Sequence, residues 1–210
     1  MVQTIQAKNV TLHDLRKKFG LQLVEDDQFF QEWQDNLSEI TDLEKQRLDR
    51  VKESYSNLLE YPPMLENTVK MVVLSPLLDL AGFYLPPFHI KSESSVEISA
   101  EDEGVIYKGQ MDVLVLFQKL WIMVIESKQA AFSLESGRAQ LLAYMLANSN
   151  PDKPTFGLLT NGATFRFFKL AKLHNHQYAL SKLFDIFNPE NKLDDVLRVL
   201  KRLGQLATNN

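Results

Sequence analysis

Leu120-Trp-Ile-Met-Val-Ile125 is followed directly by Glu126-Ser-Lys128-Gln129, and the strongest structural signal of the sequence lies here. A continuous apolar run of this length is typical of a strand that is covered on both faces, so it predicts a central position in a sheet. A carboxylate and an ammonium at the end of such a strand are exceptional. Because side chains alternate along a strand, Glu126 and Lys128 point to the same face. The stretch therefore predicts a polar site at one end of a buried strand.

A second carboxylate lies on the strand expected just before it, over residues 105–117. Asp112 precedes Glu126 by 14 residues. With a turn at 118–119, the numbers of facing residues sum to about 237, so Asp112 faces Ile125 or Glu126. Two carboxylates and a lysine then converge at one end of the sheet. Such a set can hold a hard cation through oxygen ligands and leave positions for water and phosphate.

The rest of the chain predicts an α/β architecture around this hairpin. Residues 1–62 are expected to form an N-terminal helical arm, with an aromatic cluster at 29–33 that packs onto the core, and residues 63–210 one α/β unit. The expected elements, in chain order, are a helix from Thr11 to Gly20, an amphipathic helix from Thr41 to Leu59, a buried helix over 64–81, strands over 88–99, 105–117 and 120–126, a crossover helix over 134–147, strands over 156–160 and 164–170, and a last helix over 193–206.

The composition is that of an ordinary globular protein. The chain has 210 residues, with 23 Lys plus Arg, 27 Asp plus Glu and no cysteine. The lack of cysteine excludes disulfides, thiolate zinc sites and thiol nucleophiles, and it suits the reducing cytoplasm, which is the predicted location. The N-terminus has no secretory pattern, and no apolar run approaches the roughly 18 residues that span a membrane. We therefore expect no contact with a membrane.

Charge is unevenly distributed along the chain. Residues 150–210 carry nine Lys or Arg against five Asp or Glu, a net charge of +4, whereas the other 149 residues carry 14 against 22, a net charge of −8. A local basic face favours contacts with a phosphate backbone, which position nucleic acid without reading its bases. Arg166, Lys169 and Lys172 are the candidate contacts.

The order of these motifs resembles the PD-(D/E)xK nuclease superfamily, and within it the N-terminal nuclease domain of type I restriction enzyme R subunits. Gly109-Gln-Met-Asp112 stands for the first motif and Glu126-Ser-Lys128 for the second. Gln140-Leu-Leu-Ala-Tyr144 is similar to that family's QxxxY motif, and the stretch 156–168 to its strand pair with Thr-Asn-Gly between the strands. The resemblance covers residues 64–170.

This resemblance implies a restriction-endonuclease-like core of the order α-β-β-β-α-β, with a mixed sheet flanked by helices. It implies a magnesium-dependent (or manganese-dependent) endodeoxyribonuclease, with Asp112 and Glu126 as metal ligands and Lys128 as their electrostatic partner. Glu66, Gln140 and Tyr144 complete the implied catalytic set. Two departures are visible: Met111 replaces the proline of the first motif, and the chain has no GxxxxGK[ST] sequence, so ATP dependence is not carried over.

Other interpretations of the same residues stay open. Asp112 and Lys128 could form a structural salt bridge that closes the hairpin, Glu66 could be a helix-surface acid, and Gln140 and Tyr144 could pack against the sheet. The whole chain could be an inactive nuclease-fold module that binds nucleic acid or a partner protein. A homodimer or a partner subunit would suit cleavage of both strands of a duplex.

Overall fold

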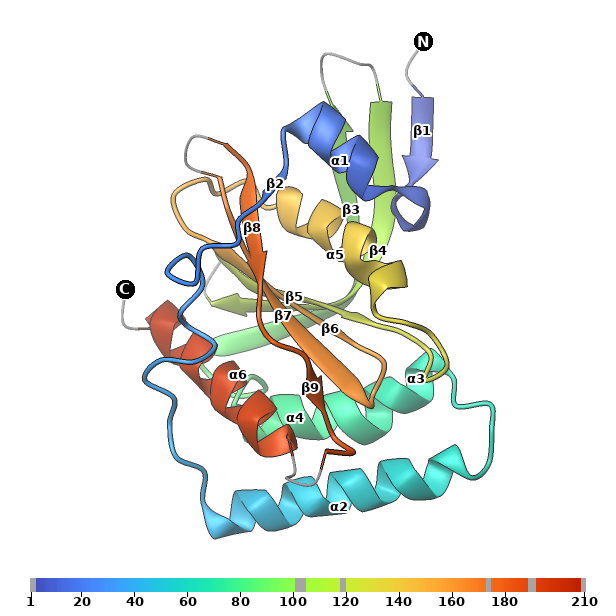
Figure 1. Ribbon diagram of the computed structural model, residues 1–210, viewed down its shortest axis with the longest axis vertical. Coiled ribbons are helices and arrows are strands. Elements are labelled where there is room, and N and C mark those ends of the chain that lie inside the picture. The colour runs from blue at the N-terminus through green and yellow to red at the C-terminus, as the bar shows by residue number, and fades with distance from the viewer. Residues whose placement is uncertain (1–2, 101–104, 118–119, 173–174, 189–191, 209–210) are drawn as a thin grey trace.

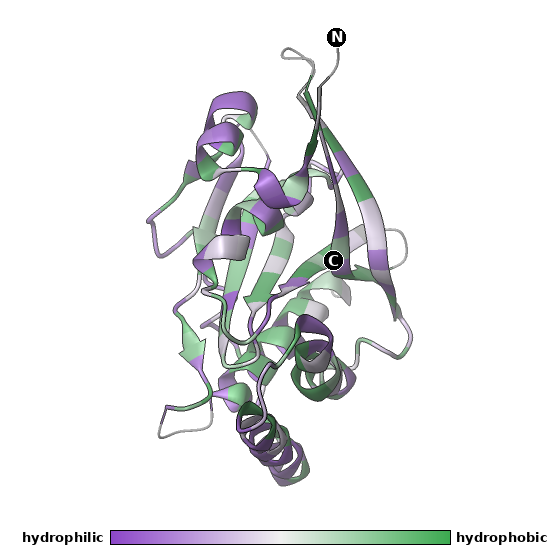
Figure 2. Ribbon diagram, turned by 90° about the vertical axis from the view of Figure 1, so that its right-hand side faces the viewer, coloured by the Kyte–Doolittle hydropathy of each residue, from purple (hydrophilic) through white to green (hydrophobic). Residues whose placement is uncertain are grey.

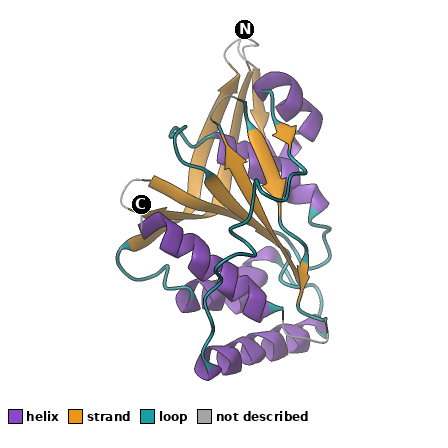
Figure 3. Ribbon diagram, turned by 60° about the vertical axis from the view of Figure 1, so that its left-hand side comes forward, coloured by secondary structure: helices purple, strands orange, loops and turns teal. Residues whose placement is uncertain are grey.

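The computed structural model describes residues 3–100, 105–117, 120–172, 175–188 and 192–208, and it contains one mixed sheet with helices on both faces (Figure 1, Figure 3). The strand order is β1-β4-β5-β6-β7-β8-β2, with β3 also paired to β4 and β9 to β7. The predicted α/β class is confirmed. The strands are β1 (Gln3–Gln6), β2 (Gln22–Leu23), β3 (Phe88–Ala100), β4 (Val105–Phe117), β5 (Leu120–Ser127), β6 (Thr155–Thr160), β7 (Thr164–Ala171), β8 (Gln177–Leu180) and β9 (Phe184–Asp185).

The helices follow the predicted order around these strands, with one irregular segment. The predicted helix over 64–81 is divided into α3, a π-helical turn η2 and α4. A π turn adds a residue to the helical repeat and changes which side chains share a face. The helices are α1 (Leu12–Phe19), α2 (Asp42–Leu59), α3 (Glu66–Val69), η2 (Lys70–Leu74), α4 (Ser75–Leu80), α5 (Glu135–Leu146) and α6 (Leu193–Thr208), and a short 3-10 turn, η1 (Ala7–Asn9), precedes α1.

The hairpin of β4 and β5 has the predicted register where Leu116 faces Trp121, and an irregularity between Val115 and Leu116 then shifts the pairing by one residue. Beyond it Val113 faces Ile125 in an antiparallel pair, and the same count continued by one residue sets Asp112 opposite Glu126. The predicted turn at 118–119 lies outside the described residues. On its other edge β5 pairs in parallel with β6, which gives it a central position. Met123, Val124 and Ile125 have no exposed surface, which confirms that both faces of the strand are covered.

Two hydrophobic clusters lie on opposite faces of the sheet. One is formed with α5 and α1, and the other with α2, the α3–α4 segment and α6 (Figure 1). Met123 and Ile125 belong to the second cluster, whereas Val124 belongs to the first. Figure 2 shows mainly hydrophobic residues along the central strands and both hydrophobic and hydrophilic residues along the helices. The end of β5 therefore lies between two packed helical layers.

The N-terminal residues are more closely joined to the sheet than a helical arm would be. They supply β1, which pairs with β4, and β2, which pairs with β8, both in parallel. Strands this short carry no periodicity that sequence analysis could detect. The aromatic cluster forms turns, and Phe30 is buried and stacks on Phe156, so the predicted packing onto the core is confirmed. The boundary between residues 62 and 63 stays a prediction.

The local signals for helix ends are confirmed. Thr11 with Asp14, and Thr41 with Glu44, form capping boxes at the starts of α1 and α2. Gly20 ends α1 with a φ of 63°, a left-handed conformation that glycine adopts at little cost. Within the described ranges, none of the helices has both the length and the apolar character needed to cross a membrane.

Candidate active site

The carboxylate of Asp112, on β4, lies beside the end of β5 and close enough to Glu126 for the two groups to repel each other. Asp112 Oδ2 accepts a hydrogen bond of 2.6 Å from the backbone N–H of Ser127, the residue after Glu126. The next backbone N–H, that of Lys128, donates to the Thr160 carbonyl at the end of β6, at 2.8 Å. The site is therefore held by backbone contacts to both neighbouring strands.

Lys128 is held between β5 and helix α5. Its Nζ atom lies 2.7 Å from Glu126 Oε1 and 2.9 Å from Gln140 Oε1. Gln140 Nε2 donates in turn to the Tyr144 hydroxyl at 2.9 Å. Gln140 and Tyr144 are one helical turn apart and share a face, which allows this chain of contacts. The ammonium is thus fixed from two elements.

Two glycines make room for these side chains. A Cβ atom at Gly137 on α5 would lie 2.9 Å from Lys128 Cε, and one at Gly109 on β4 would lie 2.7 Å from the ring of Tyr144. Both distances are shorter than normal carbon contacts, so a larger residue would force Lys128 or Tyr144 to move. Gly109 belongs to the first sequence motif, and its role here is to let α5 approach the sheet.

The segment α3–η2 approaches the site from the opposite helical layer. Lys70, the first residue of the π turn, places Nζ 2.6 Å from Asp112 Oδ1 and 3.0 Å from Glu66 Oε1. Lys70 was not predicted from the sequence, because its spacing to Glu66 is that of an ordinary surface pair on a helix. Glu66 therefore reaches the predicted carboxylates through Lys70. The ion partners in the described chain are Lys70 for Asp112 and Glu126 for Lys128, so the alternative Asp112–Lys128 salt bridge is not formed.

Glu126 is the most deeply buried charged group of the site. Its side chain is 4% exposed, and Oε2 is buried with no hydrogen-bond partner among the described residues. Burial raises the pKa of Glu126 to about 8, and repulsion by Asp112 adds to this, while Lys128 acts in the opposite direction. A buried carboxyl with an unused oxygen is costly to the fold. It is also a group that gains strongly from a bound cation.

The other titratable groups show the same competition between burial and ion pairing. Burial raises the pKa of Asp112, although Lys70 and the Ser127 N–H both act to lower it. Burial alone would lower the pKa of Lys70, but its hydrogen bonds to Asp112 and Glu66 outweigh this, and the pKa is raised. Burial, with a smaller contribution from Glu126, raises the pKa of Tyr144 to about 12. Lys70 and Tyr144 therefore keep their protons at neutral pH.

A divalent cation suits the donor set at Asp112 and Glu126, because carboxylate oxygens are the ligands that Mg²⁺ and Mn²⁺ prefer. Glu126 Oε2 is free within the described residues to take such a cation. In those same ranges, however, no three His, Asp or Glu side chains lie close enough together to hold a metal ion. A cation at this position would therefore take two carboxylates from the protein and complete its coordination with backbone oxygen, water or substrate.

The three predicted phosphate contacts do not gather at this site. Lys169 Nζ is bound by Glu32 and by the Phe29 carbonyl. Lys172 Nζ donates to the carbonyls of Leu146 and Asn148 at the end of α5, and burial lowers the pKa of Lys172 to about 8. Both ammonium groups hold the fold. Arg166 is one-third exposed and lies near the start of α5, with Nη1 3.9 Å from Glu135.

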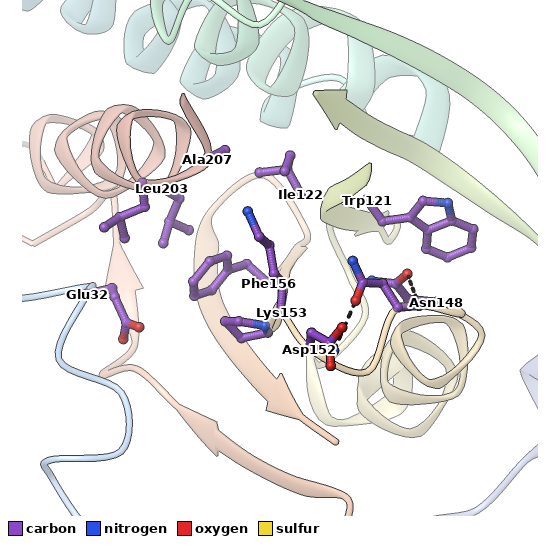
Figure 4. A pocket seen from close by; sticks show the side chains of 12 residues that line it. Glu32, Trp121, Ile122, Asn148, Asp152, Lys153, Phe156, Leu203 and Ala207 are labelled. Atoms are coloured by element: carbon purple, nitrogen blue, oxygen red, sulfur yellow. Dashed lines mark hydrogen bonds between the residues drawn. The ribbon is translucent and has the colours of Figure 1, made fainter. Parts of the chain in front are cut away.

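The cavities of the described chain differ in their distance from the carboxylates. A cavity of about 430 Å³ lies at the opposite end of β5 and β6, where Trp121, Phe156 and Lys153 line it (Figure 4). A groove of about 330 Å³ borders the site itself, with Lys70 and Asp112 in its wall. Chemistry at the carboxylates would therefore use the groove and not the cavity of Figure 4.

No family model and no curated protein matches this sequence. Among solved structures, the chain is similar to one described as "cryoEM structure DrdV-DNA complex", with a TM-score of 0.49 and 12% sequence identity. The match covers 75% of this chain and 13% of that chain. The matched region is thus a small part of that larger chain.

Proposed function

We propose that this chain is a metal-dependent nuclease that hydrolyses phosphodiester bonds of nucleic acid, with DNA as its substrate. One observation carries the proposal: Asp112, Glu126 and Lys128 meet at the end of a central strand, with the buried Glu126 Oε2 unpartnered in the described chain. The order of α3–α4, β3, β4, β5, α5 and β6 supports a restriction-endonuclease-like core. The sequence resemblance to PD-(D/E)xK nucleases agrees with both.

Each residue has a role that follows from its contacts. Asp112 and Glu126 would hold Mg²⁺ or Mn²⁺, which when bound supplies a Lewis acid for the attacking water and the phosphate. Lys128 has three N–H donors, of which Glu126 and Gln140 take two, so the third can hold a water or a non-bridging phosphate oxygen. Gln140, itself held by Tyr144, keeps the ammonium in place. These two are positioning residues.

The substrate would approach from the groove beside Lys70 and Asp112, because Asp112 is the site carboxylate that lies in the wall of a groove. Of the predicted phosphate contacts, only Arg166 stays in the proposal, since the charges of Lys169 and Lys172 are used inside the fold. Phosphate contacts of this kind set the position of the strand and give no base specificity. Whether the DNA is single- or double-stranded, and which sequence it prefers, are therefore questions for the experiment.

The test is cleavage of supercoiled plasmid and of single-stranded DNA with Mg²⁺ or Mn²⁺. We compare wild type with Asp112→Ala and Lys128→Ala, and with Lys153→Met as a control that removes one exposed charge at the opposite end of the strands. We expect metal-dependent cutting by wild type and the control, and at least about a hundredfold loss in both site variants. Cutting that survives both substitutions would contradict the proposal, since a contaminating nuclease ignores them.

A non-catalytic binding module is the second candidate, and a specific contact favours it. Lys70 already pairs with both Asp112 and Glu66, so the site has an internal cation and the protein can fold without a metal. A module of this kind would bind nucleic acid or a partner protein without cleavage. Thermal unfolding with and without Mn²⁺ separates the two candidates, because a metal that binds only the folded state raises the melting temperature. A scaffold would show no such rise.

A further inference from the structure

Lys70 occupies the side of Asp112 that a metal ion would use. Asp112 has two carboxylate oxygens, and Oδ2 is taken by the Ser127 N–H at 2.6 Å. The other oxygen, Oδ1, is 2.6 Å from Lys70 Nζ. The side chains of Asp112 and Lys70 are 11% and 22% exposed, so water screens this pair only weakly.

An ammonium and a divalent cation cannot share this oxygen at low cost. A cation bound to Oδ1 would come within a few ångströms of Nζ, and the repulsion between like charges is strong in a partly buried site. Binding of a divalent cation at Asp112 therefore requires Lys70 to move away.

The surroundings of Lys70 allow such a movement. Glu66 holds the same Nζ at 3.0 Å from the more exposed side, since its own side chain is 37% exposed. The groove of about 330 Å³ lies directly beside Lys70 and is bordered by Met71, Tyr84 and Glu93. Lys70 can thus leave Asp112, keep Glu66 as its ion partner and enter open space.

We propose that Lys70 is a resident counterion that competes with the divalent cation for Asp112 and is displaced into the groove when the cation binds. This inference rests on the metal site of the proposed function. It makes the free protein a weak metal binder. It also couples metal loading to the arrival of a phosphate group in the groove, because an anion there gives the displaced ammonium a new partner.

The experiment is calorimetric titration of the full chain with Mn²⁺ in the absence of nucleic acid. The variants are Lys70→Met and Lys70→Gln, with Lys153→Met as a control of equal net charge and Asp112→Asn as a control for the site. Lys70→Gln is included because it can still donate to Asp112 if the apolar variant does not fold. A thermal melt of each variant checks folding.

We expect the neutral variants to bind Mn²⁺ at least tenfold more tightly than wild type, Lys153→Met to bind like wild type, and Asp112→Asn to lose the site. Equal or weaker binding by a folded Lys70 variant would overturn the proposal, as would Mn²⁺ binding by no form of the chain. A phosphate dependence gives a second readout: inorganic phosphate should tighten Mn²⁺ binding in wild type and leave Lys70→Met unaffected.

The result separates this inference from the nuclease proposal. Tighter Mn²⁺ binding by the Lys70 variants, with no cleavage of any nucleic acid by wild type, would support the counterion and contradict the nuclease. Metal-dependent cleavage by wild type, with unchanged Mn²⁺ binding in the Lys70 variants, would support the nuclease and contradict the counterion.

Discussion

Two ionisable side chains lie beside helix α5: Glu126 is buried near its first half, and Lys172 is half-buried beyond its last turn. Glu126 lies on the first side, where its partner Lys128 contacts Gln140, and its Oε2 atom is buried with no partner in the described chain. Lys172 lies on the other, and its ammonium is bound by the carbonyls of Leu146 and Asn148. Burial shifts the pKa of both toward the same value, raising that of Glu126 and lowering that of Lys172 to about 8.

The difference between them lies in which polar atoms are used. Lys172 satisfies two carbonyls that a helix end would otherwise leave without donors, so its charge stabilises the fold. Glu126 keeps an unused oxygen in a position where an unpaired buried acceptor costs stability. A perturbed pKa alone does not distinguish a structural group from a functional one. Glu126 and Lys172 differ in whether a polar atom is left unused, and the following substitutions test whether this difference separates function from fold.

Glu126→Gln should have the largest effect. We expect cleavage to fall at least about a thousandfold, because the amide lacks the charge needed to hold a cation. Glu97→Gln is the matched control, since Glu97 also pairs with a lysine, Lys108, but is 59% exposed on β3. The measurement is the initial rate of plasmid cleavage under saturating Mn²⁺. Activity within tenfold of wild type in Glu126→Gln would place the catalytic carboxylate elsewhere.

Glu126→Gln should also make the metal-free protein more stable than wild type, and this difference should grow as the pH rises. The pKa of Glu126 is about 8 in the folded chain and 4.5 in the unfolded chain, so between these values the folded state binds the extra proton and stability falls with increasing pH. Below pH 4.5 the cost is absent, and above pH 8 it is complete. We expect Glu126→Gln to gain roughly 2–4 kcal/mol over wild type between pH 5 and pH 8.5.

Urea denaturation in the presence of a chelator measures this gain. Asp112 titrates in the same direction, because burial raises its pKa as well, so Asp112→Asn should show a gain of the same sign. A constant difference between wild type and Glu126→Gln across the pH range would show that Glu126 is ionised in the folded state throughout.

Lys172→Met should give the opposite pattern, with a loss of stability and no loss of cleavage. We expect the free energy of unfolding to fall by about 1–2 kcal/mol at pH 7, because two carbonyls at the end of α5 lose their donor, while cleavage by the folded fraction stays unchanged. Urea denaturation and plasmid cleavage on the same preparation give both values. A loss of cleavage without a loss of stability would restore Lys172 as the nucleic-acid contact that charge distribution predicted.

The sequence predicted the site where local signals were strong. The apolar run before Glu126 marked a central strand, and the hairpin count set Asp112 opposite Ile125 or Glu126. The pairing of Val113 with Ile125 agrees with the second of these. Gln140 and Tyr144 could be expected on one face, because a helical turn separates them. These inferences needed only side-chain periodicity and a tight turn.

Other features depend on packing between distant segments. Lys70 reaches Asp112 from a helical segment packed on the sheet, and no residue pattern predicts either this contact or the π turn that begins at Lys70. The charges of Lys169 and Lys172 counted toward a basic face, although folding directs them to Glu32 and to the end of α5. Charge counts along a chain cannot separate a solvated lysine from a buried one. The contact partners of a charge are set by tertiary structure.

Tyr144→Phe should have the smallest effect and tests how far the functional side of α5 extends. The hydroxyl accepts from Gln140 Nε2 at 2.9 Å, and Gln140 in turn holds Lys128. Its removal keeps the ring that packs against Gly109 and takes away the hydroxyl's hydrogen bonds to Gln140 and to the Gln110 backbone, so stability should fall by about 1 kcal/mol. If the chain of contacts positions Lys128, cleavage falls by roughly three- to tenfold, the factor that about 1 kcal/mol of lost positioning implies.

Single-turnover rates measure this, and Gln140→Ala should give an equal or larger loss, because it removes the link to Lys128 itself. If Tyr144→Phe is as active as wild type while Gln140→Ala is impaired, Gln140 contributes to cleavage and Tyr144 does not. Tyr144 would then serve only the packing of the fold, as we expect of Lys172 at the other end of the helix.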